Sequence, residues 1–259
     1  SSFLAGCLPF LHDSKEPSPP QHPGEETPAY SETDAPPPAP PAKAAKLPAK
    51  RPSPSAHMLV FGANDCAQLG CGPEAGDAVH TPQDLSSLGV ASAASVTFGA
   101  CHAAWATEDG EVFTVGGNDH GQCGAGSDQD VLSPRSLDAF STKPVVQVEA
   151  GASHTAAVTT QGELVTFGDS SRGQCGHGPD ALTDIRRPKV VRALAGQVVS
   201  CVACGGEFTA LCTTTAEVYT CGMGRFGALG HGDLTDRSAP TRVLDLLTVP
   251  ILSVSAGDR

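Results

Sequence analysis

The feature that most constrains this chain is a repeat of about fifty residues. A glycine-rich string recurs four times, and successive copies start 54, 52 and 54 residues apart. A proline and a second glycine marker, seen in "FGACH" and "AGASH", keep nearly the same spacing in each unit. Several landmarks that share one period indicate a repeat architecture built from one supersecondary unit. The copies of the string are "FGANDCAQLGCG", "VGGNDHGQCGAG", "FGDSSRGQCGHG" and "CGMGRFGALGHG".

Within each unit the residue pattern is that of β-strands. "EVFTVG", "ELVTFG" and "EVYTCG" are rich in β-branched and aromatic residues and end on glycine, and "HAAWATE", "HTAAVTT", "PVVQVEAG" and "PILSVSAG" predict further strands. Asp109-Gly110 and Gln161-Gly162 are hairpin-turn dipeptides, whereas Thr215-Ala216 is a poorer turn former and predicts a looser hairpin. About four strands in each unit predict the blades of an all-β propeller.

The glycines suit a propeller better than a phosphate-binding loop. No Gly-Lys-Ser or Gly-Lys-Thr sequence follows them, and no helical pattern begins after them. We therefore expect glycine to provide space where strands crowd at the propeller axis, and positive φ in the turns.

Composition divides the chain near residue 57. Fourteen of the 22 prolines lie in residues 1–57, which we interpret as a disordered, proline-rich tail. Residues 58–259 then hold the propeller repeats, about 3.5–4 blades, so the chain is predicted to be a partial propeller. Lys43, Lys46, Lys50 and Arg51 form a small basic cluster, either a solvated linker or a nuclear address.

Charge and cysteine usage narrow the functional classes. Residues 58–259 carry 11 Lys and Arg against 22 Asp and Glu, so an acidic propeller disfavours direct nucleic-acid binding. No stretch predicts a membrane span. With nothing that indicates secretion, we interpret the ten cysteines as reduced, mostly buried thiols, and expect a cytoplasmic or nuclear protein.

The motifs "G-x-x-H-x-A", "D-G-E-V-F-T-V-G" and "G-Q-x-G-x-G" resemble the regulator-of-chromosome-condensation repeat across residues 58–259. The resemblance implies blades of a seven-bladed β-propeller. Three positions depart from it: Ala67 replaces a glycine, Ala228 replaces a glutamine, and Phe208 stands where His102 and His154 stand in other units.

No catalytic, metal or cofactor site is predicted. Cys201 and Cys204 have zinc-like spacing but lack a second pair of ligands, so we place them in the blade core. Recurring His102 and His154 favour hydrogen bonds to their own blade turns over acid–base chemistry. Trp105 is single, whereas the family's light-sensing plant members share tryptophan-rich motifs, so photoreception is disfavoured.

The loop after the first glycine of each string differs between units and is the predicted partner-binding surface. The resemblance implies a non-catalytic interaction propeller like the exchange factors for Ran-type GTPases, with a protein partner and no covalent chemistry. The alternative is a scaffold or substrate-recruiting propeller within a larger ubiquitin ligase or kinase. The predicted contact residues are Asn64, Asp65, Asn118, Asp119, His120, Ser170, Ser171, Arg172, Arg225 and Phe226.

Overall fold

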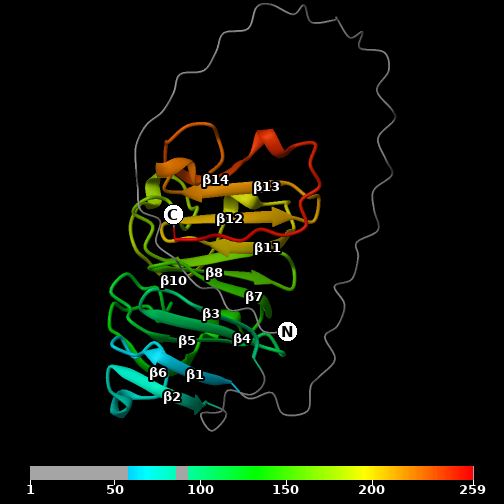
Figure 1. Ribbon diagram of the computed structural model, residues 1–259. Helices are drawn as coiled ribbons and strands as arrows, with labels where there is room; N and C mark the ends of the chain where they lie inside the picture. The colour runs from blue at the N-terminus through cyan, green and yellow to red at the C-terminus, as the bar shows by residue number, and fades with distance from the viewer. Residues whose placement is uncertain (1–57, 86–92, 259) are drawn as a thin grey trace, which may run out of the picture. The chain divides into compact units, whose positions relative to one another are not determined.

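A computed structural model describes residues 58–85 and 93–258 of the chain. The predicted tail, with its basic cluster, lies outside these residues. Within them the fold is all-β, and each predicted unit forms one antiparallel sheet, which we call a blade (Figure 1). The prediction of a partial β-propeller is therefore confirmed.

The blades follow one another along the chain. Three have four strands and the first has two. Blade 1 contains β1 (Leu59–Ala63) and β2 (Ala78–Asp84); blade 2 contains β3 (Ala93–Phe98), β4 (His102–Thr107), β5 (Val112–Gly116) and β6 (Val131–Ser136); blade 3 contains β7 (Val145–Ala150), β8 (His154–Thr159), β9 (Leu164–Gly168) and β10 (Ile185–Val190); blade 4 contains β11 (Val199–Cys204), β12 (Phe208–Thr213), β13 (Val218–Gly222) and β14 (Arg237–Arg242).

Helical structure in these residues is limited to single 3-10 turns in the connections. None reaches the length of an α-helix, and none of the described helices is long and apolar enough to cross a membrane. The turns are η1 (Pro73–Ala75), η3 (Asp138–Phe140), η4 (Pro179–Ala181), η5 (Arg192–Leu194), η6 (Arg225–Gly227) and η7 (Leu244–Leu246).

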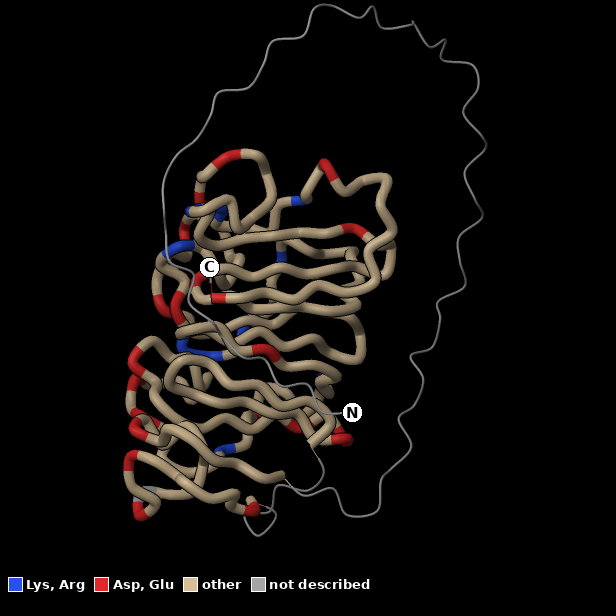
Figure 2. Tube along the Cα trace, viewed as in Figure 1, with Lys and Arg blue, Asp and Glu red and all other residues tan. Residues whose placement is uncertain are grey.

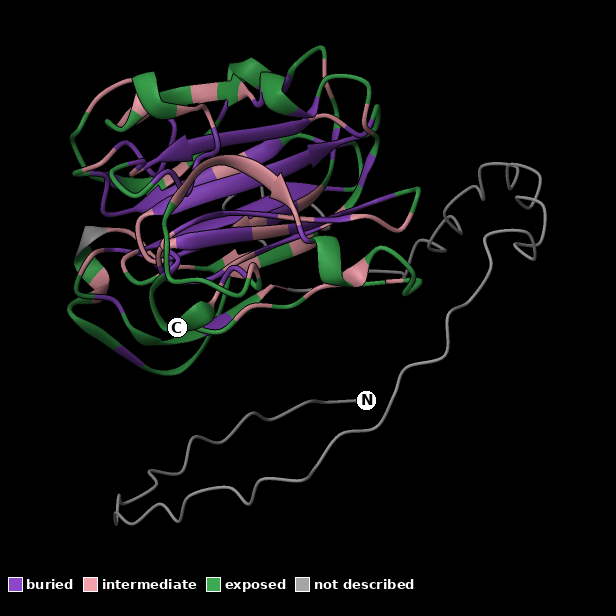
Figure 3. Cartoon of the chain, turned by 90° about the horizontal axis from the view of Figure 1, so that it is seen from above, coloured by how far each residue is buried: buried purple, intermediate pink, exposed green. Residues whose placement is uncertain are grey.

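The two largest clusters of the hydrophobic core lie between blades, while two smaller clusters lie in blade 1 and around Trp105 of blade 2. Val112 and Phe140 of blade 2 pack against Val148 and Phe167 of blade 3, and an equivalent cluster joins blade 3 to blade 4. The inner strands β4, β5, β8 and β9 are accordingly almost fully buried, whereas the outermost strands β6 and β10 are largely exposed or half-exposed (Figure 3). Because an all-β sheet must bury its apolar face against another layer, each blade stabilises its neighbour.

Glycine is required where neighbouring blades meet. The backbone amide of Ala152 donates to the oxygen of Gly206 in the next blade (3.0 Å). A Cβ added at Gly151 would overlap the Gly205 oxygen and the His154 ring, and one added at Gly99 would overlap the Gly151 oxygen. The prediction that this glycine marker provides space where strands crowd is confirmed at the contacts between blades.

The prediction of a looser hairpin at Thr215-Ala216 is wrong. The amide of Ala216 donates to Thr213 O at 2.9 Å, the same distance at which Gly110 and Gly162 close their turns. Ala216 adopts φ +62° to do so, a left-handed conformation that costs an L-residue about 1–2 kcal/mol. The ladder of β12 and β13 compensates for the unfavourable residue.

The predicted strand "PILSVSAG" is also not found. Residues 250–258 form no ladder with another described strand, and a strand needs a partner for its backbone groups. One feature of the repeat nevertheless persists, since Gly206 N donates to Asp258 O at 3.1 Å.

Candidate protein-binding loops

The loops that follow β1, β5, β9 and β13 share a scaffold that the sequence repeats. The first glycine of each loop has positive φ, from +106° to +122°. In three loops a buried glutamine then accepts a backbone N–H: Gln68 from Cys66, Gln122 from His120, and Gln174 from Arg172, each at 2.9 Å. The recurring glutamine therefore holds the loop backbone in place.

A threonine on the third strand of blades 2, 3 and 4 completes this scaffold. Thr114, Thr166 and Thr220 donate their hydroxyl protons to backbone oxygens of the following loops, at 2.7–2.8 Å. These polar groups are buried and paired, so they position the loop and leave its outer residues free to vary.

The loop of blade 4 departs from this scaffold at a definable point. Ala228 replaces the glutamine and cannot accept a side-chain hydrogen bond. The segment instead forms the turn η6, in which Phe226 has φ +64° and a 60% exposed side chain. The Arg225 guanidinium lies 4.9 Å from the centre of the Phe226 ring. This loop therefore presents a strained, exposed aromatic residue beside a cation.

The predicted contact residues divide into two groups. Asn64, Asn118 and Ser170 are buried, and the asparagine amides bond the loop backbone; Asn118 Oδ1 accepts from Cys123 N at 2.9 Å, for example. These three side chains offer no surface to a partner in this fold. The candidate surface narrows to the exposed or half-exposed Asp65, Asp119, His120, Ser171, Arg172, Arg225 and Phe226.

Adjacent loops also contact one another. His120 Nδ1 lies 3.1 Å from Asp184 Oδ1, and Arg172 Nη1 lies 3.5 Å from Asp236 Oδ2. In both pairs the first residue belongs to one blade and the aspartate, 64 residues later, belongs to the next. The loops of blades 2, 3 and 4 thus form one continuous face, and charged residues are concentrated along it (Figure 2).

The recurring histidines bond the neighbouring blade, which corrects the prediction that they bond their own turns. His102 Nε2 lies 2.8 Å from Thr155 Oγ1, and His154 Nε2 lies 2.9 Å from Thr209 Oγ1. Thr155 donates its only hydroxyl proton to Gln122 O, so His102 Nε2 must carry the proton of this pair. Burial lowers the pKa of His102 to about 3 and that of His154 to about 4, so both rings are neutral.

The cysteines do not form a zinc site on β11. Cys201 and Cys204 are three residues apart on a strand, so their side chains lie on opposite faces. Cys204 Sγ lies 3.6 Å from Glu149 O, while Cys201 stands opposite Cys212 in the ladder. All nine cysteines within the described ranges are free thiols, but only four are buried and five are partly buried, so the expectation of mostly buried thiols is wrong.

Trp105 is also part of the packing. It is 2% exposed and stacks on Phe113, with ring centroids 5.7 Å apart.

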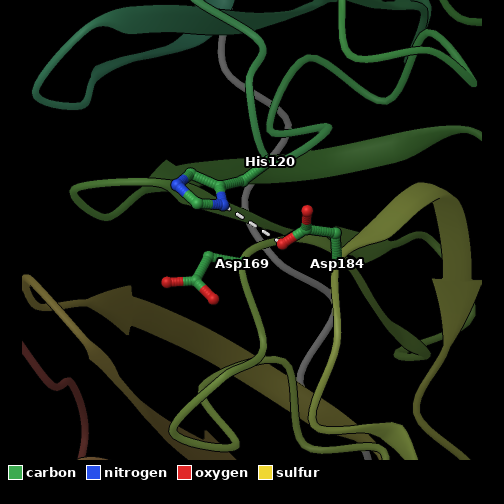
Figure 4. A group of neighbouring side chains, drawn as sticks. All are labelled: His120, Asp169 and Asp184. Carbon is green, nitrogen blue, oxygen red and sulfur yellow. Dashed lines mark hydrogen bonds and ion pairs between the residues drawn. The ribbon is translucent and has the colours of Figure 1, made fainter.

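Sequence reasoning missed one group of side chains on the loop face. His120, Asp169 and Asp184 come from three loop segments of blades 2 and 3, and their potential ligand atoms all lie within 4.8 Å of one another (Figure 4). Asp169 and Asp184 lie 49 and 64 positions after His120, which matches no local motif for metal ligands. Only the period of the repeat, about 52–54 residues, could have suggested that the three lie close together.

Comparison with known proteins agrees with this architecture. The family model described as the regulator of chromosome condensation (RCC1) repeat matches residues 109–158, 161–212 and 216–259. The chain belongs to the RCC1 repeat family. Its RCC1 repeats are 35% identical over 202 residues to the ultraviolet-B receptor UVR8 of Arabidopsis thaliana, covering 78% of this chain and 45% of that protein.

Other relatives carry the repeats within much longer chains. The human E3 ubiquitin-protein ligase HERC2 is 32% identical over 205 residues, which are 78% of this chain and 4% of the ligase. Yeast RCC1 (Prp20), in its crystal structure with Kap60, has a TM-score of 0.67 at 22% identity, covering 78% of this chain and 48% of that one. This chain therefore spans less than half the length of these relatives.

Proposed function

We propose that this chain is a non-catalytic, protein-binding propeller module whose partner contacts the loop face. The single observation that carries the proposal is the exposed Arg225–Phe226 pair on an otherwise repeated loop scaffold. Aromatic and arginine side chains dominate the binding energy of protein interfaces. A phenylalanine held at φ +64° also marks a strained position, and strained positions cluster at functional sites.

The titratable groups favour binding over covalent chemistry. Burial lowers the pKa of His102 and His154, and it raises the pKa of the Cys123 thiol to about 12. A neutral, enclosed imidazole and a protonated thiol are poorly suited to act as general acid or nucleophile at neutral pH. The His102 and His154 imidazoles and the Cys123 thiol therefore serve packing and hydrogen bonding.

Site-specific photo-crosslinking tests the proposal. A photoreactive phenylalanine analogue at position 226, in the full-length protein in cells, should give discrete crosslinked protein bands. The matched control is the same analogue at Leu244, which is 67% exposed at the turn η7, away from the candidate loops. Identical band patterns from the two positions, or no crosslink at 226, would contradict the assignment.

Within this class, the finer hypothesis is an exchange factor for a Ran-type small GTPase. Its support is the fold shared with yeast RCC1 (Prp20), together with an acidic chain suited to a basic partner surface. Such a factor accelerates GDP release by binding the nucleotide-free GTPase more tightly than the loaded one, and this needs no covalent step. Release of a fluorescent GDP analogue from Ran should then accelerate at stoichiometric full-length protein.

The second candidate is a recruiting propeller within a larger enzyme, and the HERC ligases favour it because the repeats fill only a small share of their length. The two candidates differ in one measurement. Phe226-dependent partner binding without accelerated GDP release supports recruitment, whereas acceleration that Phe226→Ala reduces supports exchange.

A further inference from the structure

The cluster of His120, Asp169 and Asp184 has the donor atoms of a transition-metal site. Figure 4 shows the imidazole of the blade 2 loop facing two carboxylates of blade 3. His120 Nδ1 and Asp184 Oδ1 are 3.1 Å apart, and all three potential ligand atoms lie within 4.8 Å of one another. Ligand atoms around tetrahedral zinc are about 3.3–3.6 Å apart, since each bond is about 2.0–2.2 Å long. The His120–Asp184 distance is already close to this spacing, and the Asp169 carboxylate lies within 4.8 Å of both ligand atoms.

Charge compensation distinguishes this cluster from the equivalent position one repeat later. There, the Arg172 guanidinium faces Asp236, and Met223 occupies the position of Asp169. One cation thus meets one carboxylate at that contact. At the blade 2–3 contact, a single imidazole meets two carboxylates, which leaves an excess of negative charge.

Nearby arginines do not correct this excess. Arg172, close to Asp169 in sequence, pairs with Asp236, and Arg186, close to Asp184, pairs with Asp128 at 3.1 Å. In the part of the chain that the structure describes, neither Asp169 nor Asp184 forms an ion pair with Lys or Arg. Two carboxylates this close repel each other unless a cation lies between them.

Asp184 also makes a different contact from Asp130 and Asp236, the aspartates at the equivalent position of the repeats before and after it. Asp130 Oδ1 accepts from Asn118 N at 3.0 Å, and Asp236 Oδ1 accepts from Gly224 N at 2.9 Å, so both close their own loops. Asp184 instead directs Oδ1 at His120 of the preceding blade. Asp169 accepts one bond, from Ser171 N to Oδ1, which leaves Oδ2 available as a ligand.

We propose that His120, Asp169 and Asp184 bind a zinc ion that links blade 2 to blade 3. Imidazole nitrogen with two carboxylate oxygens suits zinc, whereas calcium and magnesium prefer all-oxygen sites with more ligands. The imidazole binds through Nδ1 as the neutral base, so a proton on Nδ1 is released when the metal binds. The His120 side chain is 46% exposed, so water or a partner's carboxylate completes the coordination.

Calorimetric titration of the EDTA-treated, full chain with Zn²⁺ at pH 7.5 tests the site. We expect one tight zinc, with at least about tenfold weaker binding in His120→Ala, Asp184→Asn and Asp169→Met. Asp169→Met installs the residue that the next repeat carries at this position, but it also removes the acceptor for Ser171 N, so its folding is checked by its melting temperature in EDTA. The matched control is Asp119→Asn, which removes one exposed acidic charge beside His120 and should leave the affinity unchanged.

Free thiols also bind zinc, so Co²⁺ spectra decide which ligands are used. Ligation by one nitrogen and two oxygens gives visible d–d bands without the near-ultraviolet charge-transfer band that a thiolate produces. A thiolate band, or one zinc retained at full affinity in the variants, would overturn the assignment.

Thermal unfolding gives an independent readout of the same site. A hundredfold excess of free zinc over the dissociation constant should raise Tm by about 5 °C or more, and the three variants should lose this shift. In EDTA the variants should melt near the parent chain, which shows that they fold. An equal Tm rise with Ca²⁺ or Mg²⁺ would indicate unspecific binding to an acidic surface and would refute the zinc site. The partner-binding proposal is unaffected by either outcome.

Discussion

The buried histidines make a quantitative prediction about acid stability. Burial lowers the folded-state pKa of His102 to about 3 and that of His154 to about 4, from an ordinary value of 6.5. Because both folded values lie below the unfolded one, the unfolded chain binds more protons between pH 6.5 and 4. The stabilisation is therefore complete above pH 6.5 and is lost as the pH falls toward the folded pKa.

The magnitude follows from the same values. The value pH 5.0 lies 1.5 units below the pKa of an unfolded histidine, whereas the folded histidines are still neutral at this pH. Each histidine therefore lowers the free energy of unfolding by about 2 kcal/mol. Together the two histidines lower the free energy of unfolding by about 4 kcal/mol when the pH falls from 7.5 to 5.0. This is a large fraction of the 5–15 kcal/mol typical of a folded domain.

The variant His154→Phe isolates one of these contributions, and the chain itself supplies the precedent because Phe208 fills the equivalent position in blade 4. At pH 7.5 we expect a loss of about 1 kcal/mol from the missing hydrogen bond to Thr209. Between pH 7.5 and 5.0, however, the variant should lose about 2 kcal/mol less than the parent chain.

Urea unfolding monitored by Trp105 fluorescence measures this difference, since Trp105 is the only tryptophan and is buried. The control is His80→Phe at an exposed histidine of β2, which should unfold with the pH dependence of the parent. Equal losses in His154→Phe and the parent chain would refute the cross-blade histidine argument.

Three further substitutions test the scaffold, each by urea unfolding at pH 7.5. Ala216→Gly should stabilise the chain by about 1 kcal/mol because it relieves φ +62°; a destabilised variant would contradict the strain argument. Gly151→Ala should cost more than about 3 kcal/mol because its Cβ overlaps the next blade's backbone, and an unchanged midpoint would show that the blades separate easily. Gln122→Ala removes the acceptor for His120 N and should cost about 1–2 kcal/mol; a neutral result would mean that the glutamine does not hold the loop.

Much of the fold was predictable from the chain because it depends on local spacing. Strand-forming runs that end on glycine, repeated at intervals of 52 and 54 residues, predict β-blades without any knowledge of contacts. The departures were informative as well: Ala228, which lacks the repeat's glutamine, marks the loop where Phe226 turns outward. The hairpin at Ala216 was mispredicted because the regular ladder of β12 and β13 closes the turn despite a weak turn former.

The candidate site was predictable only in part. The sequence located the variable loops but not the direction of each side chain. Asn118 and Asp119 are neighbours and were both predicted as partner contacts, although Asn118 is buried and Asp119 is exposed. Pairs such as His102 with Thr155 cross from one blade to the next, and nothing in a linear pattern shows which side chains the stacking will bring together.

The sequence by itself determined the repeat, its strands and its glycine-containing hairpin turns, since these are properties of the backbone within one unit. The stacking of the units decided the rest. Three side chains of ordinary appearance, His120, Asp169 and Asp184, meet only because the loop after β5 in blade 2 contacts the loop between β9 and β10 in blade 3. Their chemistry depends on distances between blades, which tertiary packing sets.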